Sequence, residues 1–200
     1  GGTGADTIAF SAAVSGVVVS LGAGTDTLTL ADGSNTLTAT NVETVTGGTG
    51  ADAVTLGAAV TGAAVDLGAG ADTLTLANGV NTVTATNVET VTGGTGNDTV
   101  TFGAAITGAT ASLGAGTDRL ILADGANDVT VTGVETVTGG TGADTVTLSA
   151  AQSGGSFDLG AGTDTLVLAE GPQTATASSV EPVTRGTGGD ADTLDAGRGA

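Results

Sequence analysis

The chain has 200 residues and a formal net charge of −18, with three basic residues against 21 acidic ones. This balance excludes nucleic acid as a partner, since an acidic protein repels phosphate, and favours cations. The chain also contains no Cys or His, which removes the usual nucleophile–base pairs, so we expect no enzyme. No apolar run approaches the roughly 20 residues of a membrane span, so we expect no membrane insertion.

The sequence repeats itself with a period of 46 residues. Four units occupy residues 1–46, 47–92, 93–138 and 139–184, and a partial fifth unit occupies 185–200. Self-similarity of this kind is typical of solenoids, in which each unit packs on its neighbours. We therefore predict one continuous solenoid over residues 1–200. The register of Gly1 with the repeat indicates a segment of a longer array.

Each unit opens with a glycine-rich motif that ends in aspartate, GGTGAD in the first unit, and contains a second copy that begins with leucine, LGAGTD from Leu21. The motif aspartates follow one another at alternating steps of 20 and 26 residues. They are Asp6, Asp26, Asp52, Asp72, Asp98, Asp118, Asp144 and Asp164, and Asp190 or Asp192 continues the series.

The residues after each motif alternate between apolar and polar, which predicts half-buried strands. After Asp26, for example, leucines and threonines take turns from Thr27 to Leu30. The positions expected to face inward are Ile8, Val54, Val100 and Val146, then Phe10, Leu56, Phe102 and Leu148, with further columns at Val19, Val65, Ala111 and Phe157 and at Val42, Val88, Val134 and Val180. The prediction is an all-β, parallel β-solenoid of the β-roll or β-helix kind, with one coil per 20 to 26 residues, about three strands per coil, and no helix.

Antiparallel β repeats are the alternative architecture. Asp32–Gly33, Asn78–Gly79 and Asp124–Gly125 are strong two-residue hairpin signals. In a solenoid, the same dipeptides would form corners, where a positive φ is also needed. We prefer the solenoid, because a step of 20 residues is too short for an independent antiparallel module.

The motif itself suggests a cation site. Closely spaced glycines allow a tight corner to turn its carbonyl oxygens toward one point, and the aspartate adds a charged oxygen there. If neighbouring coils pair as parallel strands, the corners stack about 4.8 Å apart, so the aspartates are expected to form a column along one edge. Two unit charges at that distance repel by about 0.9 kcal/mol in water and by about 3.5 kcal/mol at an effective dielectric of 20. A divalent cation between coils reverses the sign of this contribution, and oxygen ligands in a flexible loop favour Ca²⁺.

The four opening segments, GGTGADTIA, GGTGADAVT, GGTGNDTVT and GGTGADTVT, resemble the nonapeptide G-G-x-G-x-D-x-U-x of the RTX (repeats-in-toxin) calcium-binding proteins. The resemblance implies a parallel β-roll with calcium between stacked corners, export by type I secretion, and folding on contact with extracellular calcium. The segment TNVETVTGGTG, which joins the units, is similar to the repeat region of large bacterial surface proteins, adhesins or S-layer proteins.

The candidate metal ligands are therefore the glycines and the aspartate of every copy of the motif. They are Gly2, Gly4, Asp6, Gly22, Gly24, Asp26, Gly48, Gly50, Asp52, Gly68, Gly70, Asp72, Gly94, Gly96, Asp98, Gly114, Gly116, Asp118, Gly140, Gly142, Asp144, Gly160, Gly162, Asp164 and Asp190. The cofactor expected there is Ca²⁺, and no catalytic residue is predicted.

Two other periodic features have a functional and a structural interpretation. Glu43, Glu89, Glu135 and Glu181 recur every 46 residues, and we interpret them as a solvated strand face rather than a second cation column. Threonine-rich strands such as Thr36–Thr40 suggest an ice-binding face as an alternative function. We expect the threonine rows only on every second coil, since the pattern belongs to the longer half of the repeat.

Together these features predict a calcium-stabilised structural segment of a secreted or cell-surface bacterial protein, such as an adhesin stalk, an S-layer or a self-assembling fibre. The expected partners are calcium ions and further repeats stacked end to end. An accessory calcium-binding module of a polysaccharide-modifying enzyme is the remaining alternative. The fourth unit departs from the others at Gln152, Pro172, Pro182 and Arg185, which indicates that the array ends there.

Overall fold

The computed structural model describes residues 1–184 and 193–197, and every regular element in them is a β-strand. The odd-numbered strands are β1 (Thr7–Ala9), β3 (Thr27–Thr29), β5 (Thr44–Thr49), β7 (Thr61–Ala69), β9 (Thr82–Thr86), β11 (Thr99–Phe102), β13 (Arg119–Ile121), β15 (Thr136–Thr138), β17 (Ser153–Asp158), β19 (Thr174–Ser178) and β21 (Thr193–Gly197). The even-numbered strands are β2 (Ser15–Ser20), β4 (Thr36–Thr40), β6 (Ala53–Leu56), β8 (Thr73–Thr75), β10 (Thr90–Thr95), β12 (Thr107–Ala115), β14 (Asp128–Thr132), β16 (Thr145–Leu148), β18 (Thr165–Val167) and β20 (Val183–Thr184). No helix in this part of the chain is long and apolar enough to cross a membrane.

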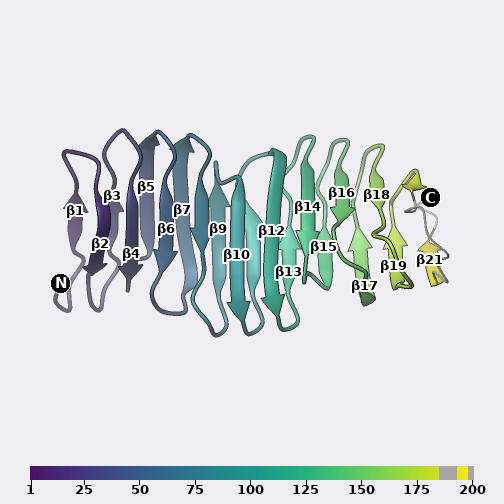
Figure 1. Cartoon of the computed structure of the whole chain (residues 1–200), viewed down its shortest axis with the longest axis horizontal. Helices are drawn as coiled ribbons and strands as arrows, with labels where there is room; N and C mark the ends of the chain where they lie inside the picture. Colours follow the sequence, from purple (N-terminus) through teal and green to yellow (C-terminus); the bar gives the residue numbers. More distant parts are fainter. Residues whose placement is uncertain (185–192, 198–200) are drawn as a thin grey trace.

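The strands form two parallel sheets that run the length of the molecule (Figure 1). One sheet contains the 11 odd-numbered strands and the other the 10 even-numbered strands, each in sequence order. The two sets of arrows run in opposite directions in Figure 1, so the chain alternates between the sheets as it advances. The predicted parallel β-solenoid is confirmed. The antiparallel alternative is wrong, because every strand pair in the described residues is parallel.

A coil contains one strand of each sheet and two corners, rather than the three strands that we expected. Paired residues lie 20 apart between Thr7 and Thr27 and 17 apart between Thr27 and Thr44. Where β2 pairs with β4, the offset is 21 residues before a bulge and 20 after it, from Ser15↔Thr36 to Val17↔Leu37. The coils therefore lie near or below the short end of the expected range.

Each 46-residue unit contributes five strands, which is an odd number. As a result, equivalent strands of successive units belong to opposite sheets. The strand after the opening motif is β1 in the first unit, β6 in the second, β11 in the third and β16 in the fourth. The sequence period therefore corresponds to two and a half coils, and only every second unit repeats on the same side of the solenoid.

The core lies between the two sheets and consists of the inward residues of the strands together with apolar residues of the connecting segments, such as Leu30 and Val42. In Thr73–Leu74–Thr75, for example, the leucine is fully buried and the flanking threonines face out. Equivalent Leu, Val and Ala side chains stack along the axis, because parallel pairing places like residues side by side. The residues predicted to face inward do lie in or against the core, but the expected stacking within each predicted column is wrong. Successive units place equivalent residues on opposite sheets, so that Val54 pairs with Leu74 and Val100 with Leu120. Ile8, Phe10 and Val180 are partly buried and pack against the rest of the core.

The dipeptides that resembled hairpin turns form corners of the solenoid. Gly33, Gly79 and Gly125 have φ angles of 97°, 108° and 102°, which a residue with a Cβ rarely adopts. The side chain before each glycine accepts a hydrogen bond from the next coil, as Asp32 Oδ1 does from the backbone N–H of Thr49 at 3.0 Å. These corners therefore bind coils together.

Candidate cation sites at the corners

Each strand is preceded by a corner of the solenoid. We call the residue at the end of the corner, just before the strand, the corner residue. In the first unit the five corner residues are Asp6, Val14, Asp26, Asn35 and Glu43. The second unit repeats this order with Asp52, Val60, Asp72, Asn81 and Glu89, and the third with Asp98, Ile106, Asp118, Asn127 and Glu135. The fourth unit has Asp144, Gln152, Asp164, Gln173 and Glu181, of which Glu181 is separated from β20 by Pro182.

The corner residues form two columns, one at the start of the odd strands and one at the start of the even strands. Since the strands of the two sheets run in opposite directions, the columns lie on opposite edges of the molecule (Figure 1). Asp52 and Asp72 are adjacent in one column, whereas Asp26 belongs to the other. The expected single column is therefore wrong. Aspartates 20 residues apart become neighbours, and those 26 apart do not, because an odd number of strands separates the units.

Within a column, each acidic or amide side chain binds the backbone of the coil before it. The backbone N–H of Asp52 donates to Asp72 Oδ1 at 2.7 Å, and that of Asp72 donates to Glu89 Oε2 at 2.7 Å. The same pattern joins Asp98 to Asp118 at 2.7 Å and Asp144 to Asp164 at 2.8 Å. This ladder satisfies a buried N–H that no strand partner reaches.

The ladder also includes residues that the sequence analysis did not assign to it. Glu43, Glu89 and Glu135 accept the N–H of the preceding aspartate, so they belong to the acidic columns and not to a separate strand face. Asn35, Asn81 and Asn127 precede the aspartates in the same way. These glutamates and asparagines all stand just before a short strand that has an apolar residue between two polar ones. That local pattern is the signal that would have identified them in the sequence.

The asparagine corners show what a fully satisfied side chain does at this position. Asn35 Oδ1 accepts the N–H of Val14 at 3.0 Å. Its Nδ2 donates to the carbonyl oxygens of Ala31 and Gly33, both at 2.8 Å, which belong to residues four and two positions earlier. Asn81 and Asn127 repeat both contacts. The corner backbone thus directs two carbonyl oxygens at the second side-chain atom.

Seven aspartate corners place an oxygen where asparagine has a donor. Their side chains are at most 1% exposed, and Oδ1 accepts the ladder hydrogen bond. The other oxygen, Oδ2, is buried with no hydrogen-bond partner in Asp26, Asp52, Asp72, Asp98, Asp118, Asp144 and Asp164. A buried carboxylate oxygen without a partner is costly, so these seven atoms are the strongest indication of a ligand in this fold.

The glycines of the motif bring carbonyl oxygens close to the aspartates. A Cβ on Gly70 would collide with the carbonyl oxygen of Gly50 in the preceding coil and lie 2.9 Å from Asp72 Oδ1. Gly24, Gly116 and Gly162 have the same surroundings, with Gly4, Gly96 and Gly142 in the preceding coils. Only glycine permits two coils to come this close, because it has no Cβ. The carbonyl oxygen of the preceding coil and the carboxylate oxygen of the aspartate therefore both lie beside the Cα of the glycine.

The charges of the column act on one another. Burial raises the pKa of Asp72 above its ordinary value, the hydrogen bond from the Asp52 N–H partly offsets this, and the charges of Glu89 and Asp52 raise the pKa further. Burial likewise raises the pKa of Asp118 and Asp164 against the same kind of hydrogen bond, with added repulsion from the acidic neighbours of each. The second aspartate of each pair therefore resists ionisation unless positive charge is supplied.

The donors available at a corner are oxygens of mixed origin. Among the described residues, no group of three or more His, Cys, Asp or Glu side chains surrounds one point. A cation would accordingly be held by one or two carboxylates and by backbone carbonyls, which is a ligand set that Ca²⁺ accepts. The carbonyls four and two residues before each aspartate belong to the glycines predicted from the sequence, such as Gly48 and Gly50 before Asp52.

Two of the predicted ligands differ from the rest. Asp6 is only partly buried, and its Oδ2 accepts the backbone N–H of Gly2 at 2.8 Å. It precedes the first strand, so no earlier coil covers its corner. Asp190 and its alternative Asp192 lie outside the described residues.

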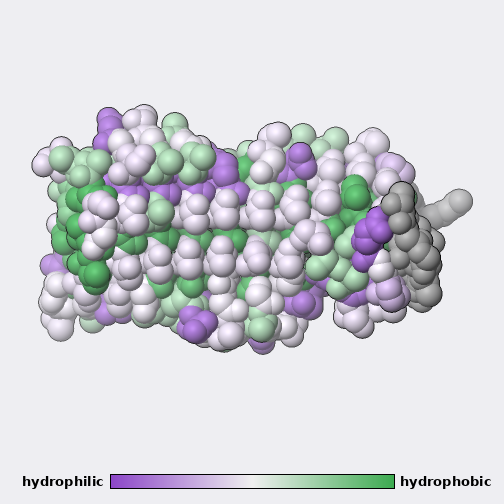
Figure 2. All heavy atoms as spheres, viewed as in Figure 1, coloured by the Kyte–Doolittle hydropathy of each residue, from purple (hydrophilic) through white to green (hydrophobic). Residues whose placement is uncertain are grey.

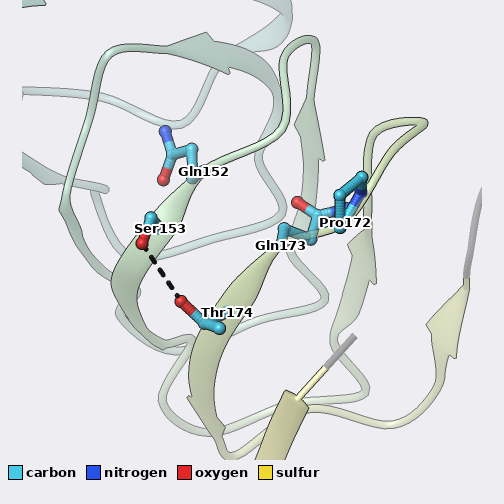
Figure 3. Close-up of a pocket in the computed structure, with 5 residues that line it drawn as sticks. All are labelled: Gln152, Ser153, Pro172, Gln173 and Thr174. Carbon is cyan, nitrogen blue, oxygen red and sulfur yellow. Dashed lines mark hydrogen bonds between the residues drawn. The ribbon is translucent and has the colours of Figure 1, made fainter. Parts of the chain in front are cut away.

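The fourth unit breaks the corner pattern at Gln152 and Gln173. In the other three units, the residue at the position of Gln152 is Val14, Val60 or Ile106. Its backbone N–H donates a hydrogen bond to the asparagine that stands at the position of Gln173. Here a cavity of about 120 Å³ is lined by Gln152, Ser153, Pro172, Gln173 and Thr174 (Figure 3). Both amide atoms of Gln152 are buried without a hydrogen-bond partner. The only bond drawn between the lining residues joins Thr174 to Ser153, at 3.5 Å.

Comparisons with protein-family models, with curated proteins and with solved structures find no match to this chain.

Proposed function

We propose that this chain is a calcium-stabilised structural segment of a secreted or cell-surface bacterial protein. The observation that carries the proposal is the buried, unpartnered Oδ2 at seven aspartate corners. At the equivalent asparagine corners, two carbonyl oxygens point at a donor. Oxygens gathered around a negative charge favour a cation at that point.

Calcium would act as a link between coils. In the metal-free chain, consecutive carboxylates such as Asp52 and Asp72 repel each other across a strand spacing of about 4.8 Å. An ion bound to Oδ2 of the aspartate and to the glycine carbonyls of the corner would turn this repulsion into attraction. Folding would then depend on extracellular calcium, in agreement with the resemblance of the motif to RTX proteins and with type I secretion.

The role that follows is mechanical. A solenoid of this kind has open ends, since β1 and β2 each pair on one side only. Further repeats of the same sequence would pair with them, either in a longer chain or in a second copy, and so extend an adhesin stalk, S-layer element or fibre. The strong negative charge supports a location outside the cell, where calcium is abundant.

A calcium titration followed by circular dichroism, with a chelator control, tests the proposal. We expect little β signal in chelator and a cooperative gain of β structure as calcium is added, with magnesium much less effective. A chain that is fully folded in chelator, and whose melting temperature does not respond to calcium, would exclude the proposal. Light scattering at high calcium tests assembly separately, and a monodisperse monomer would exclude the fibre.

A further inference from the structure

The threonine rows extend further than the sequence predicts. We expect them on every second coil, but a threonine–apolar–threonine triplet follows ten of the 20 corner residues and occurs on both sheets. On the even-numbered sheet, one outward row contains Thr38, Thr55, Thr75, Thr92, Ser112 and Thr132 in direct register. A second row contains Thr36, Ala53, Thr73, Thr90, Thr110, Thr130 and Thr147.

These rows form a regular two-dimensional array. Parallel strands place neighbours in a row about 4.8 Å apart, and alternate residues of one strand place the two rows about 6.6 Å apart. Figure 2 shows this texture on one broad face, where pale residues follow the long axis in even lines and strongly hydrophilic residues lie mostly at the margins. Each threonine presents one methyl group and one hydroxyl group.

The even-numbered face is also nearly free of charge, although the chain carries a net charge of −18. Asp128 is the one charged residue within its described strands. The odd-numbered face is interrupted by Asp66, Arg119 and Asp158 on its strands. The partner of the even face must therefore be an uncharged surface.

The composition narrows the partner further. A carbohydrate surface is usually held by aromatic stacking, but the chain has no Trp or Tyr. Of its three Phe, Phe102 and Phe157 are buried in the core and Phe10 packs against it. Within the described part of the chain, the hydroxyls of Thr55, Thr75 and Thr92 make no hydrogen bond to protein groups and so remain available. An array of equal hydroxyls and methyls at fixed spacings suits a crystalline lattice of water, whose oxygen repeats in hexagonal ice are of similar size.

We propose that the two threonine rows of the even-numbered sheet bind ice. The methyl groups order the water between the rows, and the hydroxyls donate and accept hydrogen bonds into the lattice. The rigid parallel sheet keeps the spacing constant from β4 to β16, so that many weak contacts act together. This function is separate from the proposed structural role and does not depend on which ion occupies the corners.

The test is freezing-point depression by the folded chain, measured by osmometry on single ice crystals in a calcium buffer. Wild-type protein should shape the crystals and stop their growth below the melting point. The double variant Thr75→Lys and Thr92→Lys, which places charge in the middle of one row, should lose most of this activity. The matched control Thr84→Lys and Thr101→Lys, on neighbouring strands of the other sheet, should retain it.

Circular dichroism must show that each variant is folded. If the lysine variant does not fold, Thr75→Ser with Thr92→Ser replaces it, since it keeps both hydroxyls and removes only the methyls, and a reduced activity is again expected. Absence of any depression with folded wild-type protein would overturn the proposal. An equal loss in the even-face and odd-face variants would overturn the assignment to the even sheet.

Discussion

The backbone N–H of Asp52 donates to Oδ1 of Asp72, in the next coil, at 2.7 Å, while Oδ2 of the same Asp72 is buried without a partner. The two oxygens of one carboxylate therefore have different roles. Oδ1 holds two coils together whether or not a metal is bound. Oδ2 is the oxygen that the proposed calcium site requires and that an asparagine would replace with a donor.

Asp72→Asn separates these two roles. The amide keeps Oδ1 for the Asp52 N–H, and its Nδ2 would donate to the carbonyl oxygens of Gly68 and Gly70, as Asn35 does to those of Ala31 and Gly33. In chelator we expect the variant to be more stable than wild type by about 1–3 kcal/mol, because a buried unpaired acceptor is removed. In calcium it should gain less stability than wild type does.

Urea unfolding with and without calcium measures both effects. Asp128→Asn is the matched control, since it makes the same change of charge at an exposed strand position. It should leave the response to calcium unchanged. If Asp72→Asn destabilises the chain in chelator and leaves the calcium response intact, the side chain is only a cap for the backbone.

The pH dependence of the metal-free chain follows from the raised pKa values of Asp72, Asp118 and Asp164. A group whose pKa is higher in the folded state binds its proton more tightly there. Its contribution to stability is complete below the unfolded pKa and is lost as the pH rises through the folded pKa. We therefore expect the melting temperature in chelator to fall from acidic to neutral pH.

Thermal unfolding in chelator across this range, followed by circular dichroism, is the measurement. With calcium present the trend should reverse, because the ion binds only the ionised carboxylate. A melting temperature in chelator that rises steadily toward neutral pH would contradict the burial of these three groups.

Gly70→Ala tests the close contact between coils. The new Cβ would collide with the Gly50 carbonyl oxygen, which is backbone and cannot move aside, and would crowd Asp72 Oδ1. We expect a loss of about 1–3 kcal/mol, typical of an overpacked site. Gly4→Ala is the control, because Gly4 has the same place in the motif but no atom lies within 4 Å of the point that its Cβ would occupy. Equal stability of the two variants by urea unfolding would contradict the stacking of the corners.

The solenoid and its core were predictable because parallel pairing repeats the same residue type down a column. Val54, Val100 and Val146 are apolar at one place in the period, and all are buried. The step of 20 residues likewise identified the pairs Asp52–Asp72 and Asp98–Asp118. A pattern that recurs in the sequence therefore reported correctly which side chains are buried. It did not report which of them stack, since Val54 and Val146 lie on the even-numbered sheet and Val100 on the odd-numbered sheet.

The arrangement of the two edges was not predictable from the same pattern. The five corner residues of a unit are aspartate, valine, aspartate, asparagine and glutamate. Because these residue types differ, the sequence shows no clear period at the length of one half-coil. Glu43 follows Asn41 and Val42 without a glycine-rich motif, and nothing local marks it as a corner. Without all five corners, the odd number of strands per unit is hidden, and with it the separation of Asp26 from Asp52.

The fourth unit offers a test by restoration of the common pattern. Gln152→Val combined with Gln173→Asn recreates the pair formed by Val60 and Asn81, in which the valine N–H donates to the asparagine Oδ1 at 3.1 Å. The buried amide of Gln152, which has no partner, is removed, and the lining of the cavity becomes that of the other units. We expect a gain of about 1–3 kcal/mol from the removal of unpaired buried polar atoms.

Hydrogen exchange followed by mass spectrometry localises this gain, because opening of a solenoid proceeds from its weakest coils. Protection should rise in peptides from β17 and β19 and stay constant in β7 and β9, where the pattern is already complete. The single variants should each give less than the double variant, since Gln152→Val only removes the unpaired amide and Gln173→Asn only supplies an Oδ1 acceptor for the backbone N–H of residue 152. Unchanged or reduced protection in β17 and β19 of the double variant would show that the two glutamines are already well accommodated by the fold.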